Sequence, residues 1–437
     1  MFKKLHKYDK DHYNYIKDSS GFQRVTFETL LSTRTLIKWL ILGGFIGVLI
    51  GSISTLFGHA LIFANTFREE NKWIIMTLPI GGLIIVFLYH LLKNTGDKGT
   101  NMVISSIHSS TDIPFKMAPL IFITTFITHI CGGSSGREGA AIQLGGSISN
   151  MLGKVIGLNE NDKRIIVMCG MSAGFTALFG TPMAAAIFSL EVISIGIMHY
   201  SALVPCVVAS IIAHFIATHF GIKPEAFAIA EIPAINVIGF LKILAFGALV
   251  GVVSILFCII LHRTEHVYKK YIKNHYLRIF VSGCIIILLT VLLQTDRYLG
   301  SGMNIIEGIF HGESARFYDF LLKMIFTALT LGAGFKGGEI VPSFCIGAAF
   351  GAVMASLFGL PVGLVTACGM VGVFCGVTNC PITSLLISFE LFGFEGMPYF
   401  LITVAVSYML SGYYGLYRSQ KIMYSKTETN FVNTEAH

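Results

Sequence analysis

The chain has 437 residues, of which 54% are hydrophobic and only 13% are charged. No ordinary soluble domain hides that much apolar surface, so the composition excludes the soluble fold classes. Three segments without Lys, Arg, Asp or Glu, at residues 39–64, 73–92 and 243–261, are long enough to cross a hydrocarbon core of about 30 Å. We therefore expect an all-α, polytopic membrane protein.

The net charge of +7 is concentrated beside the apolar stretches. Basic residues gather at residues 1–35, in the segment 262–278 and in the tail after residue 417. Because Lys and Arg are enriched in cytoplasmic loops, both termini are predicted to be cytoplasmic, and the basic balance gives no sign of a nucleic-acid site. We expect a cytosolic N-terminal segment at 1–35, membrane repeats at 36–225 and 226–412, and a cytosolic tail at 413–437.

Nine cysteines lie mostly within apolar or glycine-rich segments, and none forms a CxxC pair. Metal sites in proteins use paired ligands at short spacing. The cysteines are therefore interpreted as small buried residues, and we expect neither a metal nor a cofactor.

One motif, Gly132-Gly-Ser-Ser-Gly-Arg-Glu-Gly-Ala140, places a charged pair among four glycines inside an apolar region. Charge at that depth usually marks an ion path. Glycine runs let a helix begin in mid-membrane, with its free N–H groups and positive dipole end available to an anion. The carboxylate of Glu138 is itself an anion on a short tether, which predicts a proton-coupled anion transporter in which Glu138 leaves its place when it is protonated.

Arg137 precedes this glutamate directly. Adjacent residues in a helix do not face one another, so we expect no good ion pair between Arg137 and Glu138. We expect Arg137 to orient carbonyl groups of the broken helix or to raise the local positive potential.

The chain contains two similar halves. Residues 168–191 align without gaps on residues 367–390 at an offset of 199, and both copies contain a Pro-started segment that ends in glutamate, Glu191 and Glu390. The same offset places Arg137 opposite Lys336 and gives the charged motif a twin at residues 332–342. Glu339 in this twin is interpreted either as a second proton or gating group or as a helix-start acid favoured by the dipole.

With these motifs, the chain resembles the CLC family of chloride channels and chloride/proton antiporters over nearly its whole length. The matching elements are Gly136-Arg-Glu-Gly139, Gly337-Gly-Glu-Ile-Val-Pro342 and the two Pro-started helices. The resemblance implies inverted helical repeats whose broken helices meet at a midplane anion site, and a homodimer in a bacterial plasma (inner) membrane. It places the gating glutamate at Glu138. We expect the anion to be bound by Gly99, Thr100, Asn101, Met102, Gly136, Arg137, Gly139, Ile340 and Val341.

Four departures from the chloride-type pattern are similar to the fluoride/proton antiporter branch of that family. The serine turn that holds chloride is replaced by Lys98-Gly-Thr-Asn-Met102, and Ala140 stands where chloride types have proline. An aromatic residue expected near Ile340 is absent, and an acid, Glu339, is added. Val192 occupies the position of the inner proton-transfer glutamate of chloride antiporters.

Fluoride is small and strongly hydrated, so its release from water requires close donors such as backbone N–H groups, the Thr100 hydroxyl or the Asn101 amide. We therefore expect a fluoride exporter coupled to inward proton movement. Its partners are fluoride or chloride, protons and the lipid bilayer.

Two kinds of alternative remain. Within the family, the chain could be a chloride/proton antiporter or a passive chloride channel, and Val192 argues against the first only. Outside it, Gly133-Ser-Ser-Gly136 fits the GxSG pattern of rhomboid-type intramembrane serine proteases, with His129 among the available histidines; otherwise we expect no enzymatic activity. Three tail residues, Tyr413, Tyr414 and Tyr417, are candidates for the pore tyrosine of chloride types.

Overall fold

The computed structural model describes residues 22–94, 96, 98–109 and 112–437. The first part of the predicted cytosolic segment, residues 1–21, lies outside the described residues. The rest of that segment, residues 22–35, forms the beginning of the first long helix, α2 (Phe22–Glu70). The helix therefore begins earlier than the predicted start of the first membrane repeat.

The first half of the chain is built from helices of very different lengths. After α2 they are η1 (Lys72–Thr77), α3 (Leu78–Leu91), α4 (Thr100–Ser109), α5 (Met117–Ile130), α6 (Glu138–Val155), α7 (Glu160–Phe179), α8 (Pro182–Glu191), η2 (Tyr200–Ala202) and α9 (Leu203–His219). The predicted division at residues 225 and 226 falls in the segment between α9 and the next helix.

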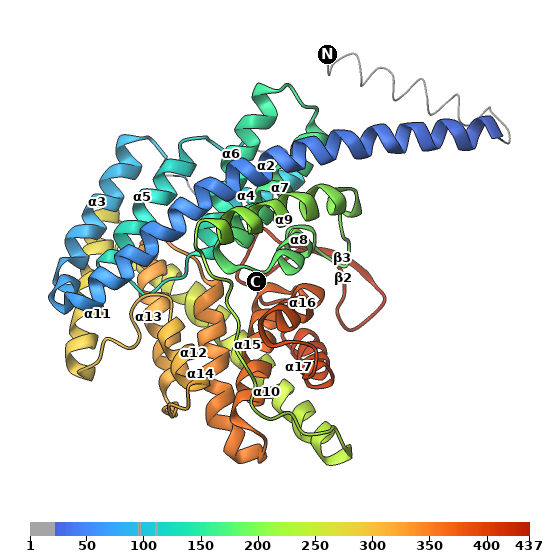
Figure 1. Cartoon of the computed structure of the whole chain (residues 1–437). Coiled ribbons are helices and arrows are strands. Elements are labelled where there is room, and N and C mark those ends of the chain that lie inside the picture. Colours follow the sequence, from blue (N-terminus) through green and yellow to red (C-terminus); the bar gives the residue numbers. More distant parts are fainter. Residues whose placement is uncertain (1–21, 95, 97, 110–111) are drawn as a thin grey trace.

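The second half repeats this order. Its helices are α10 (Val237–Tyr271), α11 (His275–Leu293), α12 (Met303–Phe310), α13 (Asp319–Ala333), α14 (Ile340–Phe358), α15 (Val362–Thr378), α16 (Pro381–Phe392) and α17 (Met397–Leu410). Figure 1 shows the blue-to-green first half across the upper part of the view and the yellow-to-red second half below it.

Within the described residues, six helical segments are long and apolar enough to cross a membrane: 28–70, 72–91, 200–219, 237–271, 275–293 and 340–358. Several of the remaining helices are too short to cross on their own. Such helices occur inside membranes where their ends are buried in protein or line a cavity. The polytopic, mostly helical architecture is thus as expected.

Three short strands depart from the all-helical expectation. Strand β1 (Ser194–Ile195), directly after α8, pairs in parallel with β2 (Lys421–Tyr424), which pairs antiparallel with β3 (Phe431–Glu435). Lys426, in the turn between β2 and β3, donates to the carbonyl of Tyr408 (3.1 Å) and to Ser411 Oγ (2.9 Å). Burial lowers the pKa of Lys426 to about 8. The predicted tail is therefore packed against the body of the protein.

Two glutamates show that the halves are inverted. Glu390, near the end of α16, accepts hydrogen bonds from the backbone N–H groups of residues 183–184 at the start of α8, at 2.8 and 2.9 Å. Glu191, at the end of α8, accepts the equivalent bonds from residues 382–383 at the start of α16, at 3.0 and 2.9 Å. Each helix therefore begins where its repeat partner ends, which is possible only if the two run antiparallel. Both carboxylates stabilise a helix start.

The repeat offset changes along the chain, which corrects one predicted alignment. Helices α7 and α15 end 199 residues apart, at Phe179 and Thr378, but α6 and α14 begin 202 residues apart, at Glu138 and Ile340. The second half is three residues shorter between these points. Arg137 therefore corresponds to Glu339 rather than to Lys336, because each is the residue before its helix.

Close glycine contacts hold the paired helices of each half together. A Cβ at Gly170 of α7 would lie 2.1 Å from Ser149 Oγ and 2.3 Å from the carbonyl oxygen of Gly145 in α6. The equivalent contact in the second half joins Gly347 of α14 to Gly369 of α15, where the corresponding distance is 2.2 Å. Small residues allow such approach of helix backbones in membranes.

We predict that Gly170→Ala lowers the apparent melting temperature of the purified protein in detergent. The added methyl has no room, and overpacking of this kind costs about 1–3 kcal/mol or more. The matched control is Gly363→Ala in α15, where the nearest atoms lie 3.8 Å or farther from the new Cβ. Equal melting temperatures for Gly170→Ala and the control would contradict the prediction.

Candidate functional site

Two helix starts meet at the centre of the site. Gly136 and Gly338, each two residues before the first residue of its helix, exchange two backbone hydrogen bonds of 2.7 Å. The pairing brings the N-termini of α6 and α14 together, with the positive ends of both helix dipoles converging. Gly139 allows this close approach, because a Cβ on it would lie 3.0 Å from the Cα of Gly338.

Glu138 lies at this junction, and its side chain is fully buried. Its carboxylate folds back over the start of α6 and accepts a hydrogen bond from the backbone N–H of Arg137 (3.1 Å) and one from Arg137 Nε (3.3 Å). The expectation of no good pair between these two residues is therefore wrong. Arg137 is the N-cap and not part of the helix, so the rule for adjacent helical residues does not apply.

Arg137 has two further contacts. Its Nη2 donates to the carbonyl of Leu178 near the end of α7 (3.2 Å) and to Glu225 Oε1 (2.8 Å). The first contact is of the expected kind, since it orients a carbonyl at a helix end. The second was not foreseen, because Glu225 lies in the segment between the two halves and belongs to no recognisable motif.

The start of α4 lies beside this junction. Thr100 Oγ1 accepts a hydrogen bond from Gln143 Nε2 (3.2 Å) and lies 3.5 Å from the carbonyl oxygen of Gly139. Asn101 Oδ1 accepts from the backbone N–H of Ser419 (3.0 Å), which ties α4 to the tail. The structure therefore brings the predicted turn at residues 99–102 next to the glycine-framed motif at residues 136–139.

The members of the predicted anion site differ in exposure. Gly136, Gly139, Ile340 and Val341 are buried, and Met102 is half-buried on α4. The repeat partner of α4, α12, begins elsewhere: its N-cap Gly302 lies against Cys345 and Lys323.

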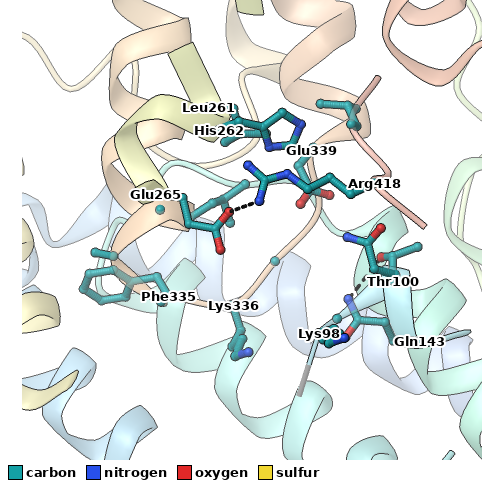
Figure 2. A pocket seen from close by; sticks show the side chains of 18 of the residues that line it. Lys98, Thr100, Gln143, Leu261, His262, Glu265, Phe335, Lys336, Glu339 and Arg418 are labelled. Carbon is teal, nitrogen blue, oxygen red and sulfur yellow. Dashed lines mark hydrogen bonds and ion pairs between the residues drawn. The ribbon is translucent and has the colours of Figure 1, made fainter. Parts of the chain in front are cut away.

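A cavity of about 690 Å³ opens from the site and is called the basic cavity here. Its basic lining residues are Lys98, Lys269, Arg278, Lys336 and Arg418, and its acidic ones are Glu265, Glu339 and Glu435. Figure 2 shows Thr100 and Gln143 on one side of this cavity and Glu265 on the other, with Arg418 reaching across the middle toward Glu265 and Glu339 close to Arg418. Cationic walls of this kind concentrate small anions.

Glu339 and Tyr417 both line the basic cavity. Glu339 Oε2 and the Tyr417 hydroxyl are buried and accept or donate no hydrogen bond among the described residues. Of the three candidate tyrosines, Tyr417 is the one that reaches the cavity, whereas the Tyr413 hydroxyl donates to Ser425 Oγ (3.2 Å). A buried polar group without a partner is costly, and these two are available to a proton or a donor ligand.

A buried lysine holds the glycine-rich loop from the other side. Lys323 of α13 is 0% exposed, and its Nζ donates to Ser134 Oγ (2.9 Å) and to the carbonyls of Tyr298 (3.2 Å) and Gly300 (2.7 Å). Three donors thus meet three acceptors. Sequence reasoning missed this residue, although a single lysine inside an apolar segment was the available signal.

The serine and histidine of the protease alternative do not meet. The ring of His129 contacts Asn65 Oδ1 (3.3 Å) and the carbonyl of Gly136 (3.4 Å). Ser134 Oγ is hydrogen-bonded to Lys323 Nζ and to Thr327 Oγ1, and Ser135 Oγ has no hydrogen-bond partner among the described residues. Within the described part of the chain, the geometry of this loop gives no activated serine.

Comparison with known proteins gives consistent results. A family model described as "Voltage gated chloride channel" matches residues 81–412. The Chloride/fluoride channel protein of Pseudomonas syringae pv. tomato is 39% identical over 396 residues, which cover 89% of this chain and 87% of that protein. The H(+)/Cl(-) exchange transporter ClcA of Vibrio cholerae is 24% identical over 395 residues, 83% of each chain.

Solved structures are similar over the same extent. The crystal structure of a CLC-type fluoride/proton antiporter superposes with a TM-score of 0.85 at 35% identity, and covers 92% of this chain and 99% of that one. A slow cyanobacterial chloride/proton antiporter gives a TM-score of 0.70 at 20% identity, covering 86% of this chain and 94% of that one; this second likeness concerns the fold alone.

We predict that Lys323→Met destabilises the protein by about 1–3 kcal/mol, because it leaves the carbonyls of Tyr298 and Gly300 unsatisfied in a buried place. The measurement is thermal unfolding in detergent. Lys72→Met is the matched control, since the Lys72 side chain is 76% exposed and paired only with Asp296 at 3.2 Å. A Lys323→Met protein as stable as this control would show that the lysine does not hold the loop.

Proposed function

Since the chain belongs to the CLC family of voltage-gated chloride channels and their transporter relatives, we propose that it is a proton-coupled fluoride antiporter that exports fluoride. The observation that carries the proposal is the placement of Glu138: a buried carboxylate that accepts the backbone N–H of Arg137 at one helix start, where a second helix start converges. A small anion requires the same donors as this carboxylate. Glu138 and fluoride therefore compete for one place.

The proposed cycle uses this competition. A proton from outside neutralises Glu138, which weakens its hold on the helix start and on Arg137. Fluoride from the basic cavity then takes the donors that the carboxylate leaves. Export completes when Glu138 returns its proton to the cytosolic side and binds the helix start again. Glu339, which lines the cavity beside Thr100, is the second proton group in this scheme.

Several observations favour fluoride over chloride. The relative at 39% identity is named a chloride/fluoride channel protein, and the structure at 35% identity is titled a fluoride/proton antiporter. The turn at residues 98–102 lacks the serine of chloride types. Val192, at the position of their inner proton glutamate, is an apolar side chain and fully buried. A chloride/proton antiporter or passive chloride channel is the alternative.

The setting of the protein is part of the proposal. Lys269 near the end of α10, Arg278 of α11 and the tail residue Arg418 line the same cavity as Lys98, so these segments lie on one side of the molecule. By the positive-inside rule that side is cytoplasmic, with both termini there. We place the protein in a bacterial plasma membrane as a homodimer with one anion pathway per subunit, and assign it transport rather than a chemical reaction.

Glu138→Gln tests the coupling directly. Gln has the size of the protonated acid but cannot exchange a proton, so proton movement driven by a fluoride gradient should be abolished in proteoliposomes. Simultaneous recording of internal pH and of fluoride efflux measures it. Glu160→Gln, an exposed acid at the start of α7, is the matched control and should behave as wild type. Coupled proton flux in Glu138→Gln would refute the proposed role.

Selectivity is predicted to depend on the Thr100 hydroxyl. Thr100→Val keeps the shape but removes a polar group beside the helix starts, and the ratio of fluoride to chloride efflux should fall about tenfold, the equivalent of about 1.4 kcal/mol. Thr100→Ser keeps the hydroxyl and should preserve the ratio. Equal efflux of both ions from wild type would favour the chloride alternative, and an unchanged ratio in Thr100→Val would place selectivity elsewhere.

A further inference from the structure

Arg137 is shared by two carboxylates. Its Nε lies 3.3 Å from Glu138 Oε1, and its Nη2 lies 2.8 Å from Glu225 Oε1. The Arg137 side chain is only 15% exposed. A guanidinium so buried is costly without a counter-ion, yet the proposed cycle requires Glu138 to become neutral and to move away.

Glu225 is held in place independently of Glu138. Pro224 lies against Gly180, where a Cβ would be 2.5 Å from the Pro224 Cα and where φ is +79°. The N–H of Phe227 donates to the carbonyl of Leu391 (2.8 Å), which anchors the segment to the end of α16. These backbone contacts hold the segment of Glu225 beside Arg137 without any contribution from the Glu138 side chain.

Arg137 is fixed on the same side. Its Nη2 also donates to the carbonyl of Leu178, near the end of α7 where Gly180 follows. Arg137, Glu225 and this helix end therefore form a unit whose contacts do not involve the Glu138 side chain. The Glu225 side chain is 21% exposed and that of Glu138 is fully buried, so Glu225 is the acid of the two that water reaches more readily.

We propose that Glu225 is the standing counter-ion of Arg137: it holds the guanidinium when Glu138 is protonated and withdraws, and so allows the gate to open without leaving a buried cation unpaired. The inference rests on the proposed function and assigns Glu225 as a positioning residue that acts through Arg137. It also divides the attraction of Arg137 between two acids, which keeps Glu138 from being locked in its ionised form.

Other charges surround this pair. Glu307 of α12 lies within electrostatic range of both Glu225 and Arg137, and Glu69 of α2 lies within range of Glu307. His129 of α5 lies within electrostatic range of Arg137, Arg68 and Lys323. On the cavity side, Tyr417 lies within electrostatic range of Glu138 and Glu339. Among the described residues, however, only Glu138 and Glu225 form an ion pair with Arg137.

The test compares proton-coupled fluoride exchange in proteoliposomes as the external side is varied from acidic to neutral pH. In Glu225→Gln, Arg137 keeps Glu138 as its ion-pair partner but loses Glu225, so its attraction for Glu138 increases and stabilises the ionised form of Glu138. Exchange at neutral pH should then be about tenfold slower than in wild type, as expected for a shift of about one pH unit, and acidification should restore it. Glu225→Asp should recover most of the rate.

A double-mutant comparison separates this role from a structural one. In the Arg137→Gln background, Glu225→Gln should cause no further change, because the residue acts through Arg137. Glu231→Gln, an exposed acid in the same segment, is the matched control. The inference is overturned if Glu225→Gln matches wild type at every pH, is slowed equally at every pH, or still slows exchange without Arg137. A wild type that does not couple fluoride to protons would instead refute the proposed function.

Discussion

The free N–H groups at helix starts are the constraint on which this structure depends. Helices α6, α8, α14 and α16 begin in apolar surroundings, where water does not satisfy the first N–H groups of a helix. At two of these starts, those of α8 and α16, the N–H groups donate to a carboxylate at the end of the other helix: Glu390 of α16 for α8, and Glu191 of α8 for α16. A third, that of α6, carries a carboxylate on its own first residue, Glu138, which accepts the N–H of the N-cap Arg137.

The difference between these carboxylates is the helix that binds them. Glu191 and Glu390 are each bound by two N–H groups of another helix, and Glu191 also accepts a 2.6 Å bond from the Thr383 hydroxyl, so neither leaves without breaking an interhelical contact. Glu138 reaches back from its own helix on a flexible side chain. The same physical device thus fixes two helices where the repeats cross and places a carboxylate tethered to its own helix at the junction of α6 and α14.

Much of this arrangement could be predicted from the sequence. Hydropathy established the helical membrane class, and the glycine-framed pair at Arg137 and Glu138 identified the site, because glycine and charge are both conspicuous in apolar segments. The alignment offset was predictable for α7 and α15 but wrong for α6 and α14, since a three-residue difference between them leaves no mark in a glycine-rich sequence. Glu225 and Lys323 were missed because each contacts the motif only through folding over a long sequence distance.

The inverted repeat also explains why the site is asymmetric. Helix α6 carries its own carboxylate at its first position, Glu138, and the corresponding first residue of α14 is Ile340. The acid of α14 is instead Glu339, the residue before the helix, so the two helix starts carry their carboxylates at different positions. In the proposed cycle, the outer side of the gate is balanced by one fixed acid, Glu225, while the inner side opens to a cavity rich in cations. Anions are thereby gathered from the inner side and protons accepted from the outer one, which is the direction that a fluoride exporter driven by inward proton movement requires.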